Sequence, residues 1–159
     1  EGIADLCSEL ESELGSGVKG QGMLLDRDMG AMPQLFAAGI HFIPHAGGTV
    51  AIGSTSERDW ESPNETDAQL ADLHGRAVEI CPALTNAEIL QRWAGVRPRA
   101  RKRAPMLGRH PTRDNVFIAN GGFKIGFGVA VKTGQVMADL VLTGQADIPD
   151  GFSVEVNLV

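Results

Sequence analysis

Arg97 is the residue whose type and position most favour ligand binding. It stands in the run Trp-Ala-Gly-Val-Arg-Pro, residues 93–98, at the end of an apolar segment. The proline that follows favours an extended backbone at Arg97. A guanidinium anchored in this way presents a planar fork of donors that suits one carboxylate. On the local sequence alone, a surface salt bridge is the alternative interpretation.

A glycine-rich run, Asn-Gly-Gly-Phe-Lys-Ile-Gly-Phe-Gly at residues 120–128, follows a short apolar segment and precedes a helical pattern. Backbone N–H groups converge at such a junction, and the helix dipole there favours negative charge. The spacing is neither GxGxxG nor GxxxxGK[ST], so the run is no ordinary phosphate loop. A tight turn that needs positive φ at several residues is the alternative.

Other site chemistries find little support. Of the histidines only His41 and His45 are close in sequence, and no carboxylate or thiol ligand accompanies them. The run Gly53-Ser-Thr lacks the GxSxG elbow of serine hydrolases. We therefore expect no metal site, and we name no catalytic acid or base.

Charge and composition favour a small-molecule partner. The chain is 43% hydrophobic and carries a net charge of −6, which argues against nucleic acid and anionic lipid. The basic residues between Arg97 and Arg103 have no interleaved aromatic, so a nucleic-acid patch is not expected. No segment approaches the ~20 apolar residues of a membrane span. The two cysteines lack CxxC spacing, which is typical of a protein of the reducing cytoplasm.

Hydrophobic periodicity and turn residues predict the elements that position these residues. Glycine ends the first and third helices, and Val136, Leu140 and Val141 of the third should face the core. Helices are expected at residues 3–14, 65–81 and 129–142, strands at 18–25, 39–45, 49–53, 88–96 and 116–119, and a polar stretch at 97–111. Helices interrupt the strands without strict alternation, which indicates an α+β fold with a mostly antiparallel sheet. A single domain, residues 1–159, is expected.

Three stretches, taken in order, resemble the C-terminal half of the D-amino-acid oxidase superfamily, the group with glycine oxidase and sarcosine oxidase. Residues 41–55 are similar to a family hairpin that ends in Gly-Ala-Thr, and residues 94–108 to its Gly-Leu-Arg-Pro and Pro-x-x-Gly segments. Residues 120–134 are similar to its glycine-rich flavin segment and the helix that follows. Lys19-Gly-Gln21 matches the strand that crosses between domains. The resemblance spans residues 18–144.

The resemblance implies FAD as cofactor and assigns roles to individual residues. Arg97 corresponds to the arginine that binds the substrate carboxylate, and His41 to a substrate-side tyrosine. Lys124 stands where the glycine-oxidase branch often has arginine and would add positive charge near the substrate. The segment lining the flavin ring corresponds to Lys124, Ile125, Gly126, Phe127 and Gly128. Residues 100–103 form a basic run where relatives commonly carry Thr-x-Asp-Gly.

The resemblance predicts part of an FAD-dependent enzyme that oxidises an amine or amino acid by hydride transfer to flavin. The family's N-terminal GxGxxG segment is absent. The chain is therefore expected to be a C-terminal substrate-binding part, lacking the dinucleotide-binding domain and FAD, and inactive alone. Met23, Leu24 and Phe127 should then be exposed, and a homodimer could cover them. The alternative is a non-catalytic binding or interaction domain that kept the fold without the chemistry.

Overall fold

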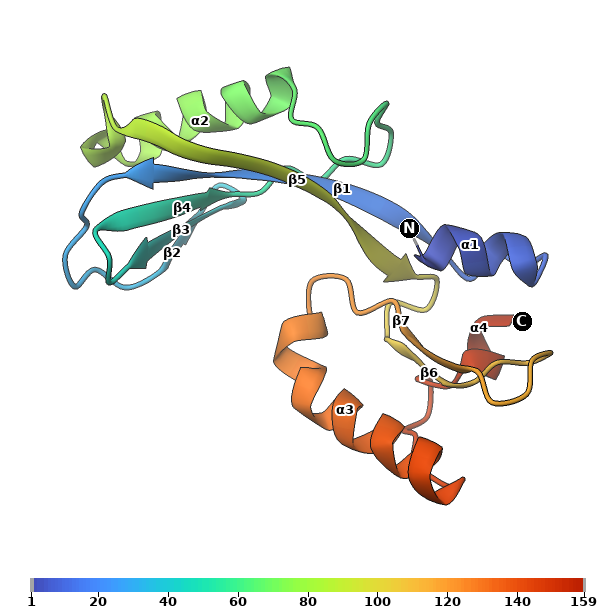
Figure 1. The fold of residues 1–159 in the computed structure, drawn as a ribbon. Coiled ribbons are helices and arrows are strands. Elements are labelled where there is room, and N and C mark those ends of the chain that lie inside the picture. The colour runs from blue at the N-terminus through green and yellow to red at the C-terminus, as the bar shows by residue number, and fades with distance from the viewer. Residues whose placement is uncertain (1, 159) are drawn as a thin grey trace. The chain divides into compact units, whose positions relative to one another are not determined.

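The computed structural model describes residues 2–158. The chain groups into two compact units (Figure 1). One consists of the chain up to Val18 together with Arg97 and the residues that follow it, and the other is formed by residues 19–96. Two long strands, β1 (Gly15–Asp26) and β5 (Glu88–Ala100), carry the chain from one unit to the other. Each unit has its own buried apolar cluster.

The unit of residues 19–96 is a sheet covered by one helix. The sheet has the order β2-β3-β4-β1-β5, and β2 with β3, β3 with β4, and β4 with β1 pair antiparallel. The short strands are β2 (Leu35–Ala37), β3 (Ile40–His45) and β4 (Thr49–Gly53). The helix α2 (Ala68–Ile80) lies along one side of the sheet and is followed by a 3-10 turn, Pro82–Leu84.

Alternation along the strands gives this sheet two different faces. Met23 pairs with Ile52, which pairs with Phe42, and all three are buried against α2. The residues between them point the other way, because successive side chains of a strand alternate. On that second face Gly22 lies opposite Gly53, and Gly53 lies opposite His41. We call it the open face.

The other unit packs three helices with a two-stranded sheet. Its elements are α1 (Gly2–Glu9), β6 (Met106–Arg109), β7 (Phe117–Asn120), α3 (Gly126–Thr143) and α4 (Val154–Leu158). β6 and β7 pair antiparallel, and the apolar core between them and the helices contains Ile3, Leu14, Ala100, Met106, Ile118 and Val154. α3 ends at Gly144, whose φ of 78° is the left-handed conformation that glycine adopts without strain. None of the helices among residues 2–158 has the length and apolar character of a membrane span.

The predicted fold class is confirmed, and the boundaries are corrected in three places. The first helix ends at Glu9 and not at residue 14, and a strand begins at Gly15, where glycine is required because an added Cβ would collide with the carbonyl oxygen of Arg99. β5 continues through Pro98, which the last position in the sheet order tolerates. Met106–Arg109 forms a strand where a polar stretch was predicted, because it pairs with β7.

Two expectations about exposure are wrong. Val141 is 50% exposed, because it lies about 100° around α3 from the buried Leu140. Met23 is 1% exposed, since its position in β1 directs it towards α2, whereas Leu24 is half-buried. Phe127 is 99% exposed, as predicted.

Asp67 defines the start of α2. Its carboxylate accepts a hydrogen bond from the backbone nitrogen of Gln69 at 2.9 Å, as an N-cap does. Hydrogen bonds from the Gln21 side chain and the Gln69 backbone, together with the Lys19 ammonium, hold the pKa of Asp67 below its ordinary value, although partial burial opposes them. The charged form of Asp67 is therefore the one that the fold favours.

Replacement of Gly121 by alanine is expected to destabilise the unit that contains α3. Gly121 has a φ of 78°, and an added Cβ would lie 2.6 Å from the Cβ of buried Ala100. We expect a loss of about 2 kcal/mol or more in the free energy of unfolding, measured by urea denaturation. Gly151→Ala is the control, because Gly151 has a φ of 84° but an added Cβ there would have no atom within 4 Å. Equal losses in the two variants would contradict the packing argument.

The low pKa of Asp67 predicts a stability contribution that depends on pH. A carboxyl whose pKa is lower in the folded state contributes stability above its unfolded pKa and loses it as the pH falls through the folded pKa. We expect Asp67→Asn, which keeps the cap but removes the charge, to lower the urea midpoint at about pH 6 and to differ less from wild type at about pH 3. An equal difference at both pH values would show that the charge is irrelevant.

Candidate functional site

Two cations meet at one aromatic ring beside the glycine-rich run. The Cζ atom of Arg97 lies 5.7 Å from the centroid of the Phe123 ring, and Nζ of Lys124 lies 5.6 Å from the same centroid. Both distances are within the range of cation–π attraction. The backbone nitrogen of Phe123 also donates a hydrogen bond to the carbonyl of Pro98 at 3.0 Å. The end of β5 and the glycine-rich run are thus joined at this point.

The turn between β7 and α3 depends on glycine at close contacts. A Cβ on Gly122 would lie 2.9 Å from the Cα of Gly126, so the turn closes on itself. The backbone nitrogen of Ile125 donates to the carbonyl of Gly122 at 3.0 Å, which leads directly into the helix. Phe123 itself has a φ of 42°, a conformation that few side chains adopt. These contacts place the Phe123 ring next to Arg97.

The N-terminus of α3 is open to a ligand. Ile125 precedes the helix and makes no side-chain cap hydrogen bond, so the N-cap residue leaves the N–H groups of the first turn uncapped. Positions 126 and 128 have no atom within 4 Å of an added Cβ, and Phe127 between them is 99% exposed. N–H donors at the positive end of a helix dipole suit an acceptor atom on a flat ring. The start of α3 is therefore accessible to a ligand that carries such an acceptor.

His41 lies in the other unit, on the open face of the sheet. Its side chain is exposed, its ring centroid lies 4.4 Å from that of Phe36, and its Nδ1 is 3.1 Å from Nε2 of Gln34. Gly53 and Gly22 continue the same row of paired residues across the sheet. Trp93 packs over Gly22, where an added Cβ would lie 2.9 Å from the indole. The indole of Trp93 is 42% exposed.

Trp93 and Phe36 were not predicted from the sequence as site residues. Both are aromatic residues on the open face, and each lies at one end of the row that contains His41. The sequence feature that could have indicated this surface is the pair of glycines within strands, Gly22 and Gly53, which leaves the middle of the row without side chains. Aromatic residues at both ends of such a row are typical of a surface that contacts a ligand.

A cavity of about 370 Å³ within the unit that contains Arg97 is lined by small residues of α3, Gly126, Ala130 and Gly134, and by Leu107 and Ala119 of the two-stranded sheet.

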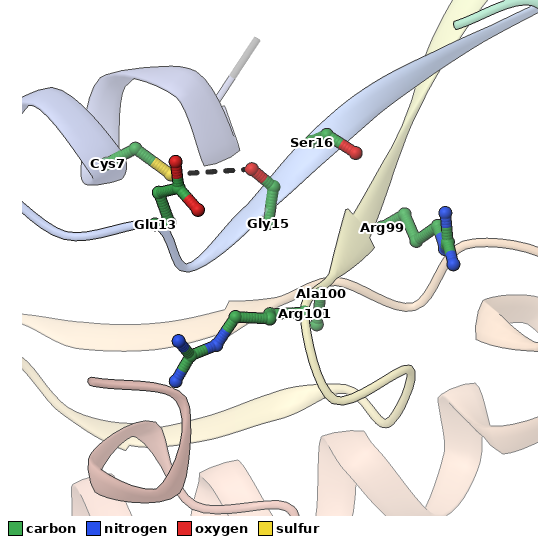
Figure 2. A pocket seen from close by; sticks show the side chains of 7 residues that line it. All are labelled: Cys7, Glu13, Gly15, Ser16, Arg99, Ala100 and Arg101. Atoms are coloured by element: carbon green, nitrogen blue, oxygen red, sulfur yellow. Dashed lines mark hydrogen bonds between the residues drawn. The ribbon is translucent and has the colours of Figure 1, made fainter. Parts of the chain in front are cut away.

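Another cavity of the same unit, of about 460 Å³, lies between α1, β1 and the end of β5, and none of the predicted site residues lines it. Figure 2 shows Arg99 and Arg101 on its wall pointing away from one another. The thiol of Cys7 in this cavity lies 3.6 Å from the carbonyl oxygen of Gly15. In the part of the chain that the structure describes, no three His, Cys, Asp or Glu side chains gather to hold a metal ion.

The comparison with protein families decides the relationship. Residues 4–140 match the model of the family described as FAD dependent oxidoreductase, abbreviated DAO. The chain belongs to this family. The match includes Arg97, the glycine-rich run and His41, so all of the site residues named above lie within the family region.

Individual relatives agree with the family. Glycine oxidase of Pseudomonas putida is 32% identical over 134 residues, which are 84% of this chain and 36% of that protein. Glycine oxidase of Bacillus licheniformis is 33% identical over 103 residues, which are 64% of this chain and 28% of that protein. The crystal structure of glycine oxidase from Geobacillus kaustophilus superimposes with a TM-score of 0.77 at 27% identity, over 98% of this chain and 42% of the other.

These findings confirm the resemblance and the fold class, and they show how much of each relative the chain corresponds to. The chain spans about a quarter to a third of the length of the curated relatives that it matches. It brings Arg97, Phe123 and Lys124 together within one unit. The roles of Arg97, Lys124, His41 and the segment from Ile125 to Gly128 stay predictions.

Proposed function

We propose that the complete protein oxidises an amine or amino acid by hydride transfer to the flavin of FAD. In this proposal residues 1–159 supply the substrate-binding part, and a dinucleotide-binding part completes the cofactor site. The observation that carries the proposal is the convergence of Arg97 and Lys124 on one ring beside the open N-terminus of α3. Membership of the FAD dependent oxidoreductase family supports the cofactor. No comparison favours the non-catalytic alternative.

The residues that would hold the flavin ring are those of the turn into α3. Lys124 offers positive charge, Gly126, Phe127 and Gly128 offer backbone donors of the first turn of α3, and Ile125 would border the ring with its side chain. The flavin, when bound, supplies the two-electron acceptor. The exposed Phe127 ring would cover part of the cofactor or its domain, and so exclude water from it.

The role of Arg97 is to bind and orient the substrate carboxylate. Its guanidinium is half-buried, and the Phe123 ring packs beside it at 5.7 Å, which limits the directions that the fork can take. An oriented carboxylate holds the adjacent C–H and amine in one position, and orientation of this kind lowers the barrier of a bimolecular step. His41, on the open face, would shape the substrate pocket. Since relatives are named glycine oxidase, a small amino acid is the substrate class proposed.

Arg97→Ala is expected to weaken the use of carboxylated substrates. We expect kcat/KM for glycine in the holoenzyme to fall at least about thirtyfold, since a charged hydrogen-bonded contact is worth about 2 kcal/mol. Arg97→Lys should restore little of this, because lysine cannot present the bidentate fork. Steady-state kinetics with glycine and with methylamine, which lacks the carboxylate, measure the effect. An equal loss with both amines would assign Arg97 to structure.

An apolar stripe on α3 is the surface proposed to be covered in the assembled protein. Phe127, Val131 and Leu142 are 99%, 85% and 82% exposed, and their spacing of four and eleven residues places them on one side of the helix. Large exposed apolar side chains in a row are typical of a contact surface. In the chain by itself, we propose that a second copy covers this stripe and forms a homodimer.

Removal of Phe127 from the stripe is expected to reduce association. Phe127→Ser should raise the dissociation constant of the dimer at least about tenfold, because it removes a large exposed aromatic from the contact. Light scattering coupled to gel filtration, over a range of protein concentrations, gives the mass. Lys132→Ser, which is exposed and lies at least about 80° around α3 from each residue of the stripe, is the control and should leave the mass unchanged. A monomer at every concentration for the unaltered chain would refute the homodimer.

A further inference from the structure

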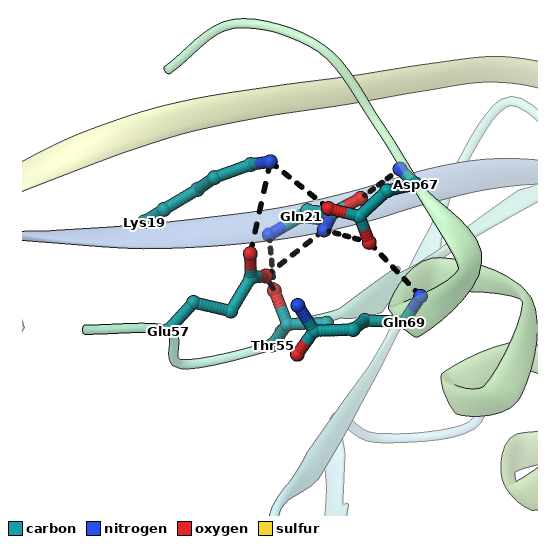
Figure 3. A network of polar contacts seen from close by, with 6 residues as sticks. All are labelled: Lys19, Gln21, Thr55, Glu57, Asp67 and Gln69. Carbon is teal, nitrogen blue, oxygen red and sulfur yellow. Dashed lines mark hydrogen bonds and ion pairs between the residues drawn. The ribbon is translucent and has the colours of Figure 1, made fainter. Parts of the chain in front are cut away.

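Polar side chains from three separate segments meet on the α2 side of strand β1 (Figure 3). Lys19 and Gln21 come from β1, Thr55 and Glu57 follow β4, and Asp67 begins α2. The exposed fractions of Lys19, Gln21 and Glu57 are 2%, 0% and 5%, so three strongly polar residues are removed from water. Groups of this kind are stable in the interior only when they satisfy one another.

Gln21 is the centre of this network, because every polar atom of its side chain and backbone has a partner there. Its Nε2 donates to Oε1 of Glu57 at 2.9 Å and to Oδ1 of Asp67 at 2.8 Å. Its Oε1 accepts from the backbone nitrogen of Asp67 at 2.9 Å. Its backbone nitrogen donates to Oγ1 of Thr55 at 2.8 Å, and its carbonyl accepts from the Thr55 nitrogen at 3.2 Å.

The orientation of the Gln21 amide follows from these partners. Two carboxylates can only accept, and the backbone N–H of Asp67 can only donate, so the amide nitrogen and oxygen cannot be exchanged. Neither a carboxylate nor an apolar side chain at position 21 could satisfy all three partners. The side chain therefore specifies both the residue type and one alignment of β1 with the segments around Glu57 and Asp67.

Ion pairs of Lys19 with Asp67 and Glu57 also favour this one alignment of β1. The Lys19 ammonium lies 3.1 Å from Oδ2 of Asp67 and 3.7 Å from Oε2 of Glu57, the second distance being an ion pair too long for a hydrogen bond. The Thr55 hydroxyl also contacts Glu57 Oε1 closely. Two carboxylates thus share one ammonium, and the Gln21 amide group supplies the additional positive dipole between them. Buried polar groups of this kind often contribute more to a unique alignment than to stability.

The alignment matters because of what lies on the opposite face of the same strand. Gly22 follows Gln21 and points to the open face, where it is opposite Gly53, which is opposite His41. Thr55 lies two residues beyond Gly53. Its hydroxyl and its backbone nitrogen both bond to the backbone of Gln21, and these two hydrogen bonds hold β1 to the segment after β4 next to that row. A shift of β1 by one residue would exchange the two faces.

We propose that Gln21 is a positioning residue for the substrate pocket: its buried amide locks β1 to Thr55, Glu57 and Asp67 and thereby fixes the sheet row that carries His41. The link to a substrate rests on the proposed function. The link to the His41 row rests only on contacts within residues 19–96.

Gln21→Met tests the proposal with Gln69→Met as a matched control. Gln69 is exposed and close to the network, and among the contacts found for it only its backbone takes part. In the holoenzyme, Gln21→Met should speed hydrogen exchange of the Asp67 amide and of residues 55–57 at least about tenfold and should shift the NMR signals of the His41 ring. With glycine as substrate, kcat/KM should fall about tenfold while the flavin absorbance stays unchanged. Gln69→Met should match wild type throughout.

The readouts separate this proposal from the proposed oxidase function. If neither the wild type nor Gln69→Met oxidises an amine, the proposed oxidase function is wrong. The hydrogen-exchange rates and the NMR signals of the His41 ring still test the positioning role of Gln21. Unchanged hydrogen exchange in Gln21→Met would show that Gln21 does not hold β1 to the neighbouring segments. Faster exchange without a change in the His41 signals would show that Gln21 does not fix the sheet row that carries His41.

A charge swap provides a second test if Gln21→Met does not fold. Gln21→Glu places a third carboxylate in the network and should speed exchange of the Asp67 amide. Adding Glu57→Gln exchanges amide and carboxylate across the 2.9 Å contact and should restore at least part of the protection. No restoration in the double variant would show that the two side chains do not act as a pair.

Discussion

The close approach of the turn at Gly121 and Gly122 to its neighbours is the constraint on which the proposed site depends. Position 121 lies against Ala100 at the end of β5, and position 122 lies against Gly126 at the start of α3, each too close for a Cβ. These two contacts fix where β7 ends and where α3 begins. They also carry Phe123 to the strand that holds Arg97, so the meeting of Arg97, Phe123 and Lys124 follows from backbone packing.

In the other unit, the long strand β1 determines the geometry, because its side chains alternate between the two faces of the sheet. Its odd-numbered residues, Lys19, Gln21 and Met23, face α2, first as a polar network and then as part of the apolar core. Its even-numbered residues, such as Gly22, face the open side. One strand thus provides the polar contacts that determine its alignment and a surface without bulky side chains, and the two properties are coupled because the side-chain period is two.

Sequence patterns predicted the elements that have strong local signals. The hairpin around Gly47-Gly48 and the helix capped by Asp67 form close to the predicted positions, because turn residues and an N-cap act over a few residues. Leu14 was assigned to a helix because its spacing is helical, but it is buried in the core beside the strand start at Gly15. The strand Met106–Arg109 exists only through its pairing with β7, a contact that no local pattern contains.

The candidate site was predicted in part for a similar reason. The type and neighbours of Arg97 and the glycine-rich run were visible in the sequence, and the resemblance to a family related them. Lys124 is the chain neighbour of Phe123, but the approach of Arg97 to the same ring accompanies the hydrogen bond between the Phe123 nitrogen and Pro98, which joins residues 25 positions apart. Trp93 was not predicted because an aromatic in an apolar segment is usually a core residue, whereas here its indole packs over Gly22 and stays 42% exposed.

Lys124 and Arg97 differ in exposure, and they should therefore contribute differently to the binding of a carboxylate. Lys124 is exposed, so water and salt screen its charge, and a charge of this kind contributes little to the binding of one anion. Arg97 is half-buried beside an aromatic ring, where screening is weaker and the side chain has fewer orientations. A carboxylate that reaches both cations would therefore gain most of its binding energy and its orientation from Arg97. Lysine at position 124, where the resemblance predicts arginine, is thus compatible with carboxylate binding, because the charge of this exposed residue contributes less than that of Arg97.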